Sequence, residues 1–163
     1  MNKTIIVIPT LNEYENVEIL LDEFVKLDVD VVFIDDSSID GTDQTIENNI
    51  YFDKKFYLIK RKSKLGYASA CIEGINFGIN NNYETIVQMD ADLSHSIADL
   101  KNLLNTSHKS DVTIGSRYVE GGNIVGWGPF RKYLSYIANL TCRKLLRIEI
   151  SDFTSGFRVY DAK

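Results

Sequence analysis

Short apolar segments alternate with amphipathic segments along the first 116 residues, and this order constrains the fold more than any other feature of the sequence. The apolar segments are rich in β-branched residues and bounded by turn residues, so they predict strands at Thr4–Ile8, Asp30–Ile34, Phe56–Lys60, Thr85–Met89 and Asp111–Ser116. Helical spacing between them predicts helices that include one burying Val17, Leu20, Leu21 and Phe24, one from Tyr67 to about Asn80, and Ile97–Asn105. Such alternation predicts an α/β fold with a mostly parallel sheet covered by helices on both faces.

Polar residues follow four of the predicted strands directly. They are Pro9-Thr10, Asp35-Asp36, Asp90-Ala91-Asp92 and Ser116-Arg117. The carboxyl ends of parallel strands lie at one edge of a sheet, and ligands of such folds bind outside that edge. We therefore expect a binding site that combines these segments.

Capping patterns predict where helices begin. Asn12 with Glu15 three residues later has the pattern of a capping box, and Ser96 with Asp99 repeats it. Four glycines between residues 121 and 128 predict a loop, and Pro129 suits the first turn of a last helix. The apolar residues of that helix favour packing on the core; a helix on a membrane surface, or one whose first turn binds a phosphate, is the alternative.

Composition restricts the class of protein. At 163 residues the chain fits one domain, and its net charge of −5 argues against a nucleic-acid-binding protein, although residues 129–163 carry seven Lys and Arg against three Asp and Glu. Two cysteines without C-x-x-C spacing predict neither a disulfide framework nor a zinc site. The sequence contains neither a signal-peptide core nor an apolar run of 18 residues, so we expect a cytoplasmic protein, peripheral on the cytoplasmic face of a membrane if the last helix lies there.

The acidic pair after the fourth strand, Asp90 and Asp92, allows three interpretations. Two carboxylates one residue apart repel each other unless a cation lies between them, and Mg²⁺ is commonly held by one or two carboxylates together with substrate phosphates. Two solvated aspartates in a loop are the plain alternative. The pattern also fits the nucleophile loop of a dehalogenase-type phosphatase, but such a loop would follow the first strand and need an acidic pair downstream.

The first strand-to-helix turn excludes two other nucleotide-binding classes. Residues 10–13 contain no glycine, so the Gly-x-Gly-x-x-Gly pattern that lets a pyrophosphate approach the backbone is absent, and so is the Walker pattern. A metal-bridged diphosphate, as in a nucleotide sugar, remains.

Six motifs in order resemble those of one family. They are Val7–Glu13, Ile34–Thr42, Lys64–Ala68, Gln88–His95, Gly115–Tyr118 and Ser151–Arg158. The sequence resembles the family 2 glycosyltransferases of GT-A fold, a Rossmann-like architecture, and more narrowly the dolichyl- and polyprenyl-phosphate mannose synthases. Members usually continue past the last motif, so residues 1–163 are expected to form a single catalytic domain without the family's C-terminal part.

The resemblance implies roles for individual residues. The nucleotide sugar would be bound by Pro9, Thr10, Glu13, Asp36, Asp90, Ala91 and Asp92. Mg²⁺ or Mn²⁺ would be held by Asp90, Asp92 and Ser94, although a serine is a weak ligand at a position where some relatives have glutamine. Turn-making is the preferred interpretation for Asp35 and Asp40.

The acceptor phosphate would be bound by Arg117, Arg131 and Ser135, and the catalytic residues would be Asp92, Arg117 and Arg131. An arginine fork pairs two phosphate oxygens; a simple ion pair is the alternative for either arginine. The implied reaction is the inverting, metal-dependent transfer of mannose from GDP-mannose to a polyprenyl or dolichyl phosphate. A UDP-sugar donor, a glycan hydroxyl acceptor, and a catalytically silent nucleotide-sugar-binding module are the alternatives.

Overall fold

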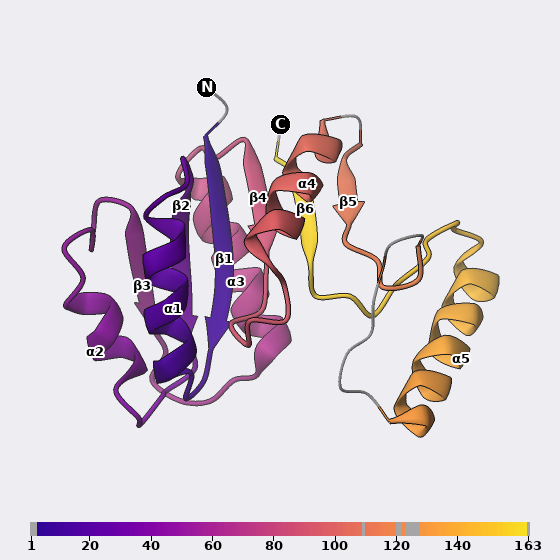
Figure 1. Cartoon of the computed structure of the whole chain (residues 1–163), viewed down its shortest axis with the longest axis horizontal. Helices are drawn as coiled ribbons and strands as arrows, with labels where there is room; N and C mark the ends of the chain where they lie inside the picture. Colours follow the sequence, from indigo (N-terminus) through magenta and orange to yellow (C-terminus); the bar gives the residue numbers. More distant parts are fainter. Residues whose placement is uncertain (1–2, 109, 120–121, 123–127, 163) are drawn as a thin grey trace.

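The computed structural model describes residues 3–108, 110–119, 122 and 128–162. A six-stranded sheet in the order β3-β2-β1-β4-β6-β5 forms its centre (Figure 1). The strands are β1 (Thr4–Thr10), β2 (Asp30–Asp35), β3 (Phe56–Lys60), β4 (Thr85–Gln88), β5 (Val112–Ile114) and β6 (Arg158–Asp161). The helices are α1 (Tyr14–Phe24), α2 (Thr42–Glu47), α3 (Tyr67–Asn80), α4 (Ile97–Ser107) and α5 (Pro129–Leu146). The predicted α/β alternation is confirmed, and most of the glycine-rich segment at 121–128 lies outside the described residues.

The sheet is parallel except for β6, a strand that the sequence analysis did not predict. β1 pairs in parallel with β2 and β4, and β2 with β3. β6 is antiparallel to both β4 and β5, so β5 runs in the same direction as β4 but is separated from it. Four residues with a charge at each end carry little strand signal, and the neighbouring strands supply the pairing.

Helices cover both faces of the sheet. Ile6 and Ile8 of β1 are fully buried on the face covered by α1, α2 and α4. Ile5 and Val7 are fully buried on the opposite face, which α3 covers. The two faces of β1 are thus both core, which is why its sequence is continuously apolar.

The beginnings of the helices confirm one capping prediction and correct the other. Ser96 Oγ accepts from the backbone N–H of Asp99 at the start of α4, as expected. At α1 the predicted Asn12–Glu15 box is wrong, because Asn12 Oδ1 accepts instead from the N–H of Ile39. The first N–H groups of α1 are satisfied from the β2–α2 loop, where Thr42 Oγ1 accepts from Glu13 N and Asp40 from Tyr14 N. Two loops at the carboxyl edge of the sheet are therefore joined.

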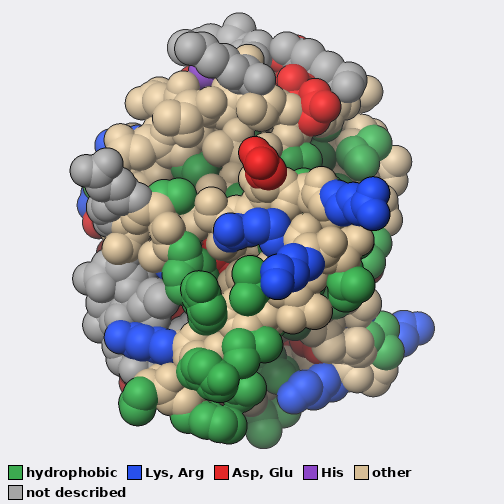
Figure 2. All heavy atoms as spheres, turned by 90° about the vertical axis from the view of Figure 1, so that its right-hand side faces the viewer, with side chains coloured by type: hydrophobic (Ala, Val, Ile, Leu, Met, Phe, Trp, Pro, Cys, Tyr) green, Lys and Arg blue, Asp and Glu red, His purple; other side chains and the backbone are tan. Residues whose placement is uncertain are grey.

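Helix α5 lies apart from the sheet, and the prediction that it packs on the core is wrong (Figure 1). Phe130 is 74% exposed and Leu145 is 77% exposed, and the helix is joined to the chain before β6 through its polar side, where Asn139 Oδ1 accepts from Phe153 N. Figure 2 shows apolar side chains together with lysines and arginines on this side of the molecule. None of the helices in the described part of the chain is long and apolar enough to cross a membrane.

Candidate functional site

A cavity of about 880 Å³ opens at the carboxyl ends of β1, β2 and β4. Its lining includes all seven residues that the sequence analysis assigned to the nucleotide sugar: Pro9, Thr10, Glu13, Asp36, Asp90, Ala91 and Asp92. Residues from α3 and from the segment before β6 complete the wall. The described residues that line the cavity do not include Ser94, Arg117, Arg131 or Ser135.

Asp36 is buried in the wall and already has three donors. Its carboxylate accepts from the backbone N–H groups of Leu65 and Gly66 at 2.9 and 2.8 Å, and from Arg61 Nη1 at 3.0 Å. Burial opposes ionisation of Asp36, but these donors outweigh it and hold its pKa below the ordinary value. Asp36 therefore enters any ligand contact as an oriented anion. Arg61, which the sequence analysis missed, also donates to Gly66 O and Ser69 Oγ, and so fixes the loop that leads into α3.

The neighbouring Asp35 confirms its predicted turn-making role. It accepts from the N–H of Ser38 and from the hydroxyl of Thr10, which lines the cavity. Asp40 likewise accepts from the N–H of Thr42. These bonds set the shape of the β2–α2 loop beside the cavity.

Asp90 follows β4 and lines the cavity between two side chains. The hydroxyl of Tyr67 donates to Oδ1 at 2.5 Å, and His95 Nε2 lies 3.5 Å from Oδ2. Burial opposes ionisation of Asp90, but His95 and Tyr67 lower its pKa below the ordinary value. The His95 ring is stacked on Phe157, with ring centres 4.5 Å apart, so it is held in place beside the carboxylate. Asp90 is thus an anion at neutral pH.

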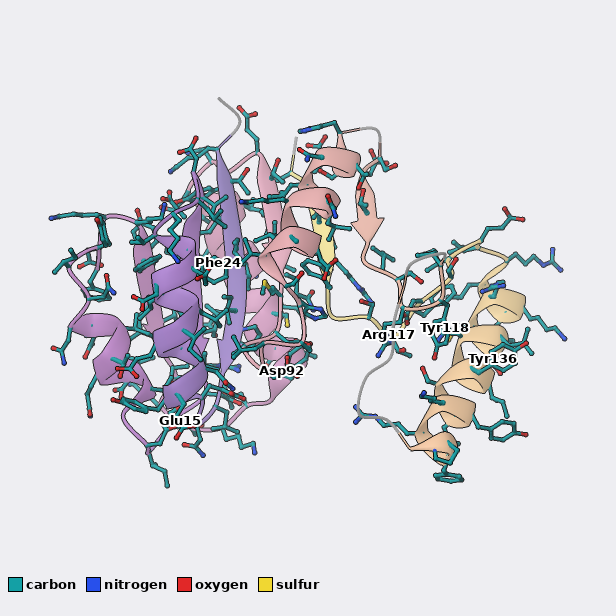
Figure 3. The ribbon with its side chains drawn as sticks, viewed as in Figure 1. Glu15, Phe24, Asp92, Arg117, Tyr118 and Tyr136 are labelled. Atoms are coloured by element: carbon teal, nitrogen blue, oxygen red, sulfur yellow. The ribbon has the colours of Figure 1, made fainter. Side chains whose placement is uncertain are left out.

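Asp92 projects from the same turn and is exposed, with Oδ1 accepting from the N–H of Ser94 (Figure 3). No group of three or more His, Cys, Asp and Glu arranged for a metal occurs in the described part of the chain. Two ionisable carboxylates facing one cavity nevertheless fit a hard divalent cation whose other ligands come from substrate phosphates and water. Ser94 contributes its backbone to the turn, and its role as a ligand stays a prediction.

Three further residues of the cavity were quoted in motifs but given no role. Tyr67, Gly156 and Arg158 all line it. Arg158 donates to the carbonyls of Ser155 and Phe153, which fixes the segment before β6. A Cβ at Gly156 would lie 2.7 Å from Tyr67 Oη and 2.9 Å from Asp90 Oδ2, so any larger residue here must displace one of these two side chains. Only the pairing of β6 with β4, which the sequence did not reveal, places Gly156 here.

Arg117 is paired with a buried carboxylate, which is the alternative that the sequence analysis left open for it. Nε and Nη2 each donate at 2.8 Å to Asp152, which is fully buried, and Nη2 also donates to Thr154 Oγ1. Burial opposes ionisation of Asp152, but Arg117 and neighbouring donors keep its pKa below the ordinary value. The fork expected to bind the acceptor phosphate is therefore engaged within the protein. β6 separates the β5 end, where Arg117 lies, from β4.

Ser135 of α5 lies close to the Arg117 pair, whereas the cavity wall does not include Arg131. Ser135 Oγ accepts from the Tyr118 hydroxyl at 2.9 Å and lies 3.3 Å from Thr154 Oγ1. Figure 3 shows Arg117 and Tyr118 between the sheet and α5. Arg131 is exposed in the first turn of α5. Arg117 and Ser135 thus border the chain between α5 and the cavity, Arg131 lies at the start of α5, and the acceptor role of all three stays a prediction.

Comparison with known proteins identifies the family. The sequence profile described as Glycosyl transferase family 2 matches residues 5–163. The chain belongs to glycosyltransferase family 2. The family predicted from the six motifs is confirmed.

Two curated proteins are similar over nearly the whole chain. An undecaprenyl-phosphate mannosyltransferase of Micrococcus luteus is 35% identical over 162 residues, covering 98% of this chain and 67% of that protein. A polyprenol monophosphomannose synthase of Mycolicibacterium smegmatis is 36% identical over 162 residues, covering 97% of this chain and 61% of that protein. The chain thus spans about 61–67% of the length of these two curated relatives.

A solved structure shares the fold. A mannosyltransferase from Pyrobaculum calidifontis, in complex with GDP-Man and Mn²⁺, superposes with a TM-score of 0.56 at 20% identity, covering 98% of this chain and 44% of that one. At this identity the likeness shows the fold alone. The predicted GT-A fold of this family 2 chain is confirmed.

Proposed function

We propose that this chain is the nucleotide-sugar-binding and catalytic part of a polyprenyl-phosphate mannosyltransferase. In this proposal mannose passes from GDP-mannose to a polyprenyl phosphate with inversion at the anomeric carbon, and the reaction depends on Mg²⁺ or Mn²⁺. The names of the two curated relatives support the acceptor and the sugar, and GDP-Man with Mn²⁺ in the solved relative supports the donor.

The observation that carries the proposal is that all seven residues assigned to the nucleotide sugar by the resemblance line one cavity. Its volume of about 880 Å³ lies within the range of roughly 300–1,000 Å³ that is usual for ligand sites. Thr10, Glu13 and Asp36 offer acceptors for the N–H and O–H groups of a nucleoside. Asp90 and Asp92 lie at the β4 end, where the diphosphate would lie.

Asp90 and Asp92 would hold the divalent cation against the diphosphate. When bound, such a cation neutralises the negative charge that develops on the departing diphosphate. The protein's own contribution is to orient the two carboxylates, because Tyr67 fixes Asp90 and the N–H of Ser94 fixes Asp92. This orientation is part of what aligns the anomeric carbon with the acceptor.

A phosphate acceptor needs no general base. The second pKa of a phosphate monoester is about 6, so the acceptor is already an anion at neutral pH. The acceptor oxygen bonds to the anomeric carbon as the bond to the diphosphate oxygen breaks, and this single displacement inverts the configuration. Arg131 and Ser135 would position the acceptor phosphate, and Arg117 would contribute by holding Asp152 and Thr154 in the chain beside it.

Helix α5 supports an association with the surface of a membrane on its cytoplasmic face. Its exposed apolar residues include Phe130, Tyr133, Leu134 and Leu145. The helix carries Arg131, Lys132, Arg143 and Lys144 and no acidic residue. A lipid acceptor and this combination of apolar and basic side chains suit the same anionic surface.

Nucleotide titration tests the proposal. GDP, UDP, GDP-mannose and UDP-glucose are titrated into the protein with and without Mn²⁺. The transfer of radiolabelled mannose from GDP-mannose into a lipid fraction is then measured. We expect Mn²⁺-dependent binding of GDP and GDP-mannose, and label in the lipid. Binding of UDP but not of GDP would mean that the donor is a UDP-sugar. Nucleotide binding without transfer of mannose would favour a catalytically silent nucleotide-sugar-binding module. No binding of either nucleotide would overturn the proposal.

A further inference from the structure

A chain of three hydrogen bonds connects β6 to the acidic pair. The hydroxyl of Tyr160 donates to Gln88 Oε1 at 3.1 Å, Gln88 Nε2 donates to Tyr67 Oη at 3.2 Å, and the hydroxyl of Tyr67 donates to Asp90 Oδ1 at 2.5 Å. All four side chains line the cavity. We infer that Tyr67 is the positioning residue of Asp90, and that Gln88, oriented by Tyr160, fixes the direction in which the Tyr67 hydroxyl hydrogen points.

The direction follows from the donor and acceptor inventory. A tyrosine hydroxyl has one hydrogen, so when Oη accepts from Gln88 its own hydrogen is left for Asp90. An amide turned the other way would accept that hydrogen at Oε1 and would leave Asp90 Oδ1 without this donor. In the orientation that serves Asp90, the Tyr160 hydroxyl donates to Oε1 and so satisfies the amide oxygen that Tyr67 leaves free.

The backbone around this chain of bonds leaves the partners little room to separate. Tyr67 is the first residue of α3, and the helix is anchored by Arg61 through Gly66 and Ser69. Gly156 lies against Tyr67 Oη and both carboxylate oxygens of Asp90. Gln88 and Tyr160 lie on the paired strands β4 and β6. The bonds are thus carried by regular elements rather than by a free loop.

This role rests on the proposed function and adds to it. Groups that hydrogen-bond a ligating carboxylate fix its orientation, and their loss typically lowers metal affinity about 10- to 100-fold. Tyr67 would therefore determine how much Mn²⁺ the protein needs in order to bind a nucleoside diphosphate, without contacting the reacting atoms itself.

The chain contains a matched control at the opposite end of the sheet. The hydroxyl of Tyr83 donates to Asp30 Oδ2 at 2.6 Å, the same type of bond, and Asp30 is the first residue of β2. Tyr83 is 3% exposed, against 49% for Tyr67, so Tyr83→Phe removes the more deeply buried bond. It should lower the midpoint of thermal unfolding at least as much as Tyr67→Phe.

The experiment is a calorimetric titration of GDP at a series of Mn²⁺ concentrations. In Tyr67→Phe we expect the Mn²⁺ concentration for half-maximal GDP binding to rise about 10-fold or more, with metal-free GDP affinity unchanged. In Tyr83→Phe it should stay at the wild-type value. Wild-type Mn²⁺ dependence in Tyr67→Phe, or an equal change in both variants, would overturn the inference and leave the proposed function standing. Wild-type protein that binds neither GDP nor UDP with Mn²⁺ would overturn both.

Two further variants test the direction of the bonds. In Gln88→Glu the new carboxylate offers no hydrogen to Tyr67 and accepts one from it, so the Mn²⁺ requirement should rise at least as far as in Tyr67→Phe. Tyr160→Phe releases the amide and should produce a smaller rise, which can be measured even if Gln88→Glu does not fold. A wild-type Mn²⁺ requirement in Tyr160→Phe would overturn the orienting role of that residue.

Discussion

The α-carbon of Gly156 lies against the carboxylate of Asp90, so that a methyl group placed there would come within 2.9 Å of Oδ2 and 3.0 Å of Oδ1. The contact joins residues 66 positions apart, and it exists because β6 pairs with β4 in the register Gln88↔Arg158. The last motif of the sequence thus forms the wall that keeps Asp90 in place. A glycine at this position leaves both side chains where they are, and two experiments on glycines follow from this kind of contact.

The first prediction concerns Gly156→Ala. The added methyl group must displace the Tyr67 hydroxyl or the Asp90 carboxylate, so Mn²⁺-dependent GDP affinity should fall about 10-fold or more, as for other losses around a metal ligand. Calorimetric titration measures it. Gly128→Ala is the control, because a Cβ there meets nothing within 4 Å. Equal GDP affinity in Gly156→Ala and wild type would mean that the segment around Gly156 moves to accept the methyl group and leaves Asp90 in place.

The second prediction concerns Gly74→Ala in α3. A Cβ at Gly74 would lie 2.2 Å from Val7 Cγ1 and 3.2 Å from Ile34 Cγ1, so the helix must move away from β1 and β2. Overpacking costs about 1–3 kcal/mol, whereas the better helix propensity of alanine returns about 1 kcal/mol. The cost of overpacking should exceed the gain in helix propensity, so the free energy of unfolding, measured in urea, should fall. Exposed Asn76→Ala gains propensity without a clash and should be slightly stabilising; a stabilised Gly74→Ala would contradict the packing argument.

The third prediction concerns Asp92→Asn. Asp92 is exposed and its one described bond is to a backbone N–H, which an amide oxygen can also accept, so the fold should be kept. The loss of the charge should abolish the Mn²⁺-dependent increase in GDP affinity, because Asp90 alone is left to hold the cation. Asp22→Asn, at an exposed position of α1, makes the same change of charge away from the cavity. Wild-type Mn²⁺ dependence in Asp92→Asn would remove Asp92 from the ligands.

The meeting of the residues proposed to bind the nucleotide could be predicted from the sequence because it depends on local rules. Strand ends in a parallel sheet meet at one edge, so Thr10, Asp36 and Asp90 had to come together once the alternation of strands and helices was recognised. The side chains that orient them, such as Tyr67 and Arg61, are set by three-dimensional packing and have no period or spacing of their own.

The surroundings of the residues proposed for the acceptor could not be predicted in the same way, because they depend on β6. The insertion of this short antiparallel strand between β4 and β5 moves Arg117 one strand away from Asp90 and brings Gly156 in its place. The sequence of α5 also has an apolar stripe, but a stripe does not reveal what it contacts. In the structure the helix is held through Ser135 and Asn139, and Leu145 is exposed.

The fourth prediction concerns Arg117→Ala. Removing the cation leaves the fully buried Asp152 carboxylate without its main partner, which costs about 3–5 kcal/mol; the remaining bonds from Thr154 favour the lower end. The pKa of Asp152 in the folded protein lies below the unfolded value of about 3.9, so the stabilisation is present above that pH and is lost as the pH falls through the folded pKa. The difference in unfolding free energy between wild type and variant should therefore be largest at pH 7 and narrow below about pH 4.

Denaturation in urea at pH 7, 5 and about 3, on either side of the expected transition, measures this difference. Lys62→Ala, which removes a positive charge from an exposed position, should change stability by less than about 0.5 kcal/mol at each pH. A pH-independent difference between wild type and Arg117→Ala would show that the side chain stabilises by packing rather than by its charge.

The fifth prediction separates acceptor from donor through Arg131→Ala. If Arg131 binds the acceptor phosphate, its loss removes a charge-assisted hydrogen bond worth about 1.5–3 kcal/mol, so binding of a short isoprenyl phosphate should weaken about 10- to 100-fold. GDP affinity with Mn²⁺ should stay at the wild-type value, because Arg131 lies outside the cavity lining. Lys132→Ala removes an adjacent exposed charge of the same helix and controls for a general attraction of anions to α5. A matching loss of GDP affinity in Arg131→Ala would mean that Arg131 binds the donor. Equal losses of isoprenyl phosphate affinity in Arg131→Ala and Lys132→Ala would mean that Arg131 acts only through the overall positive charge of the helix.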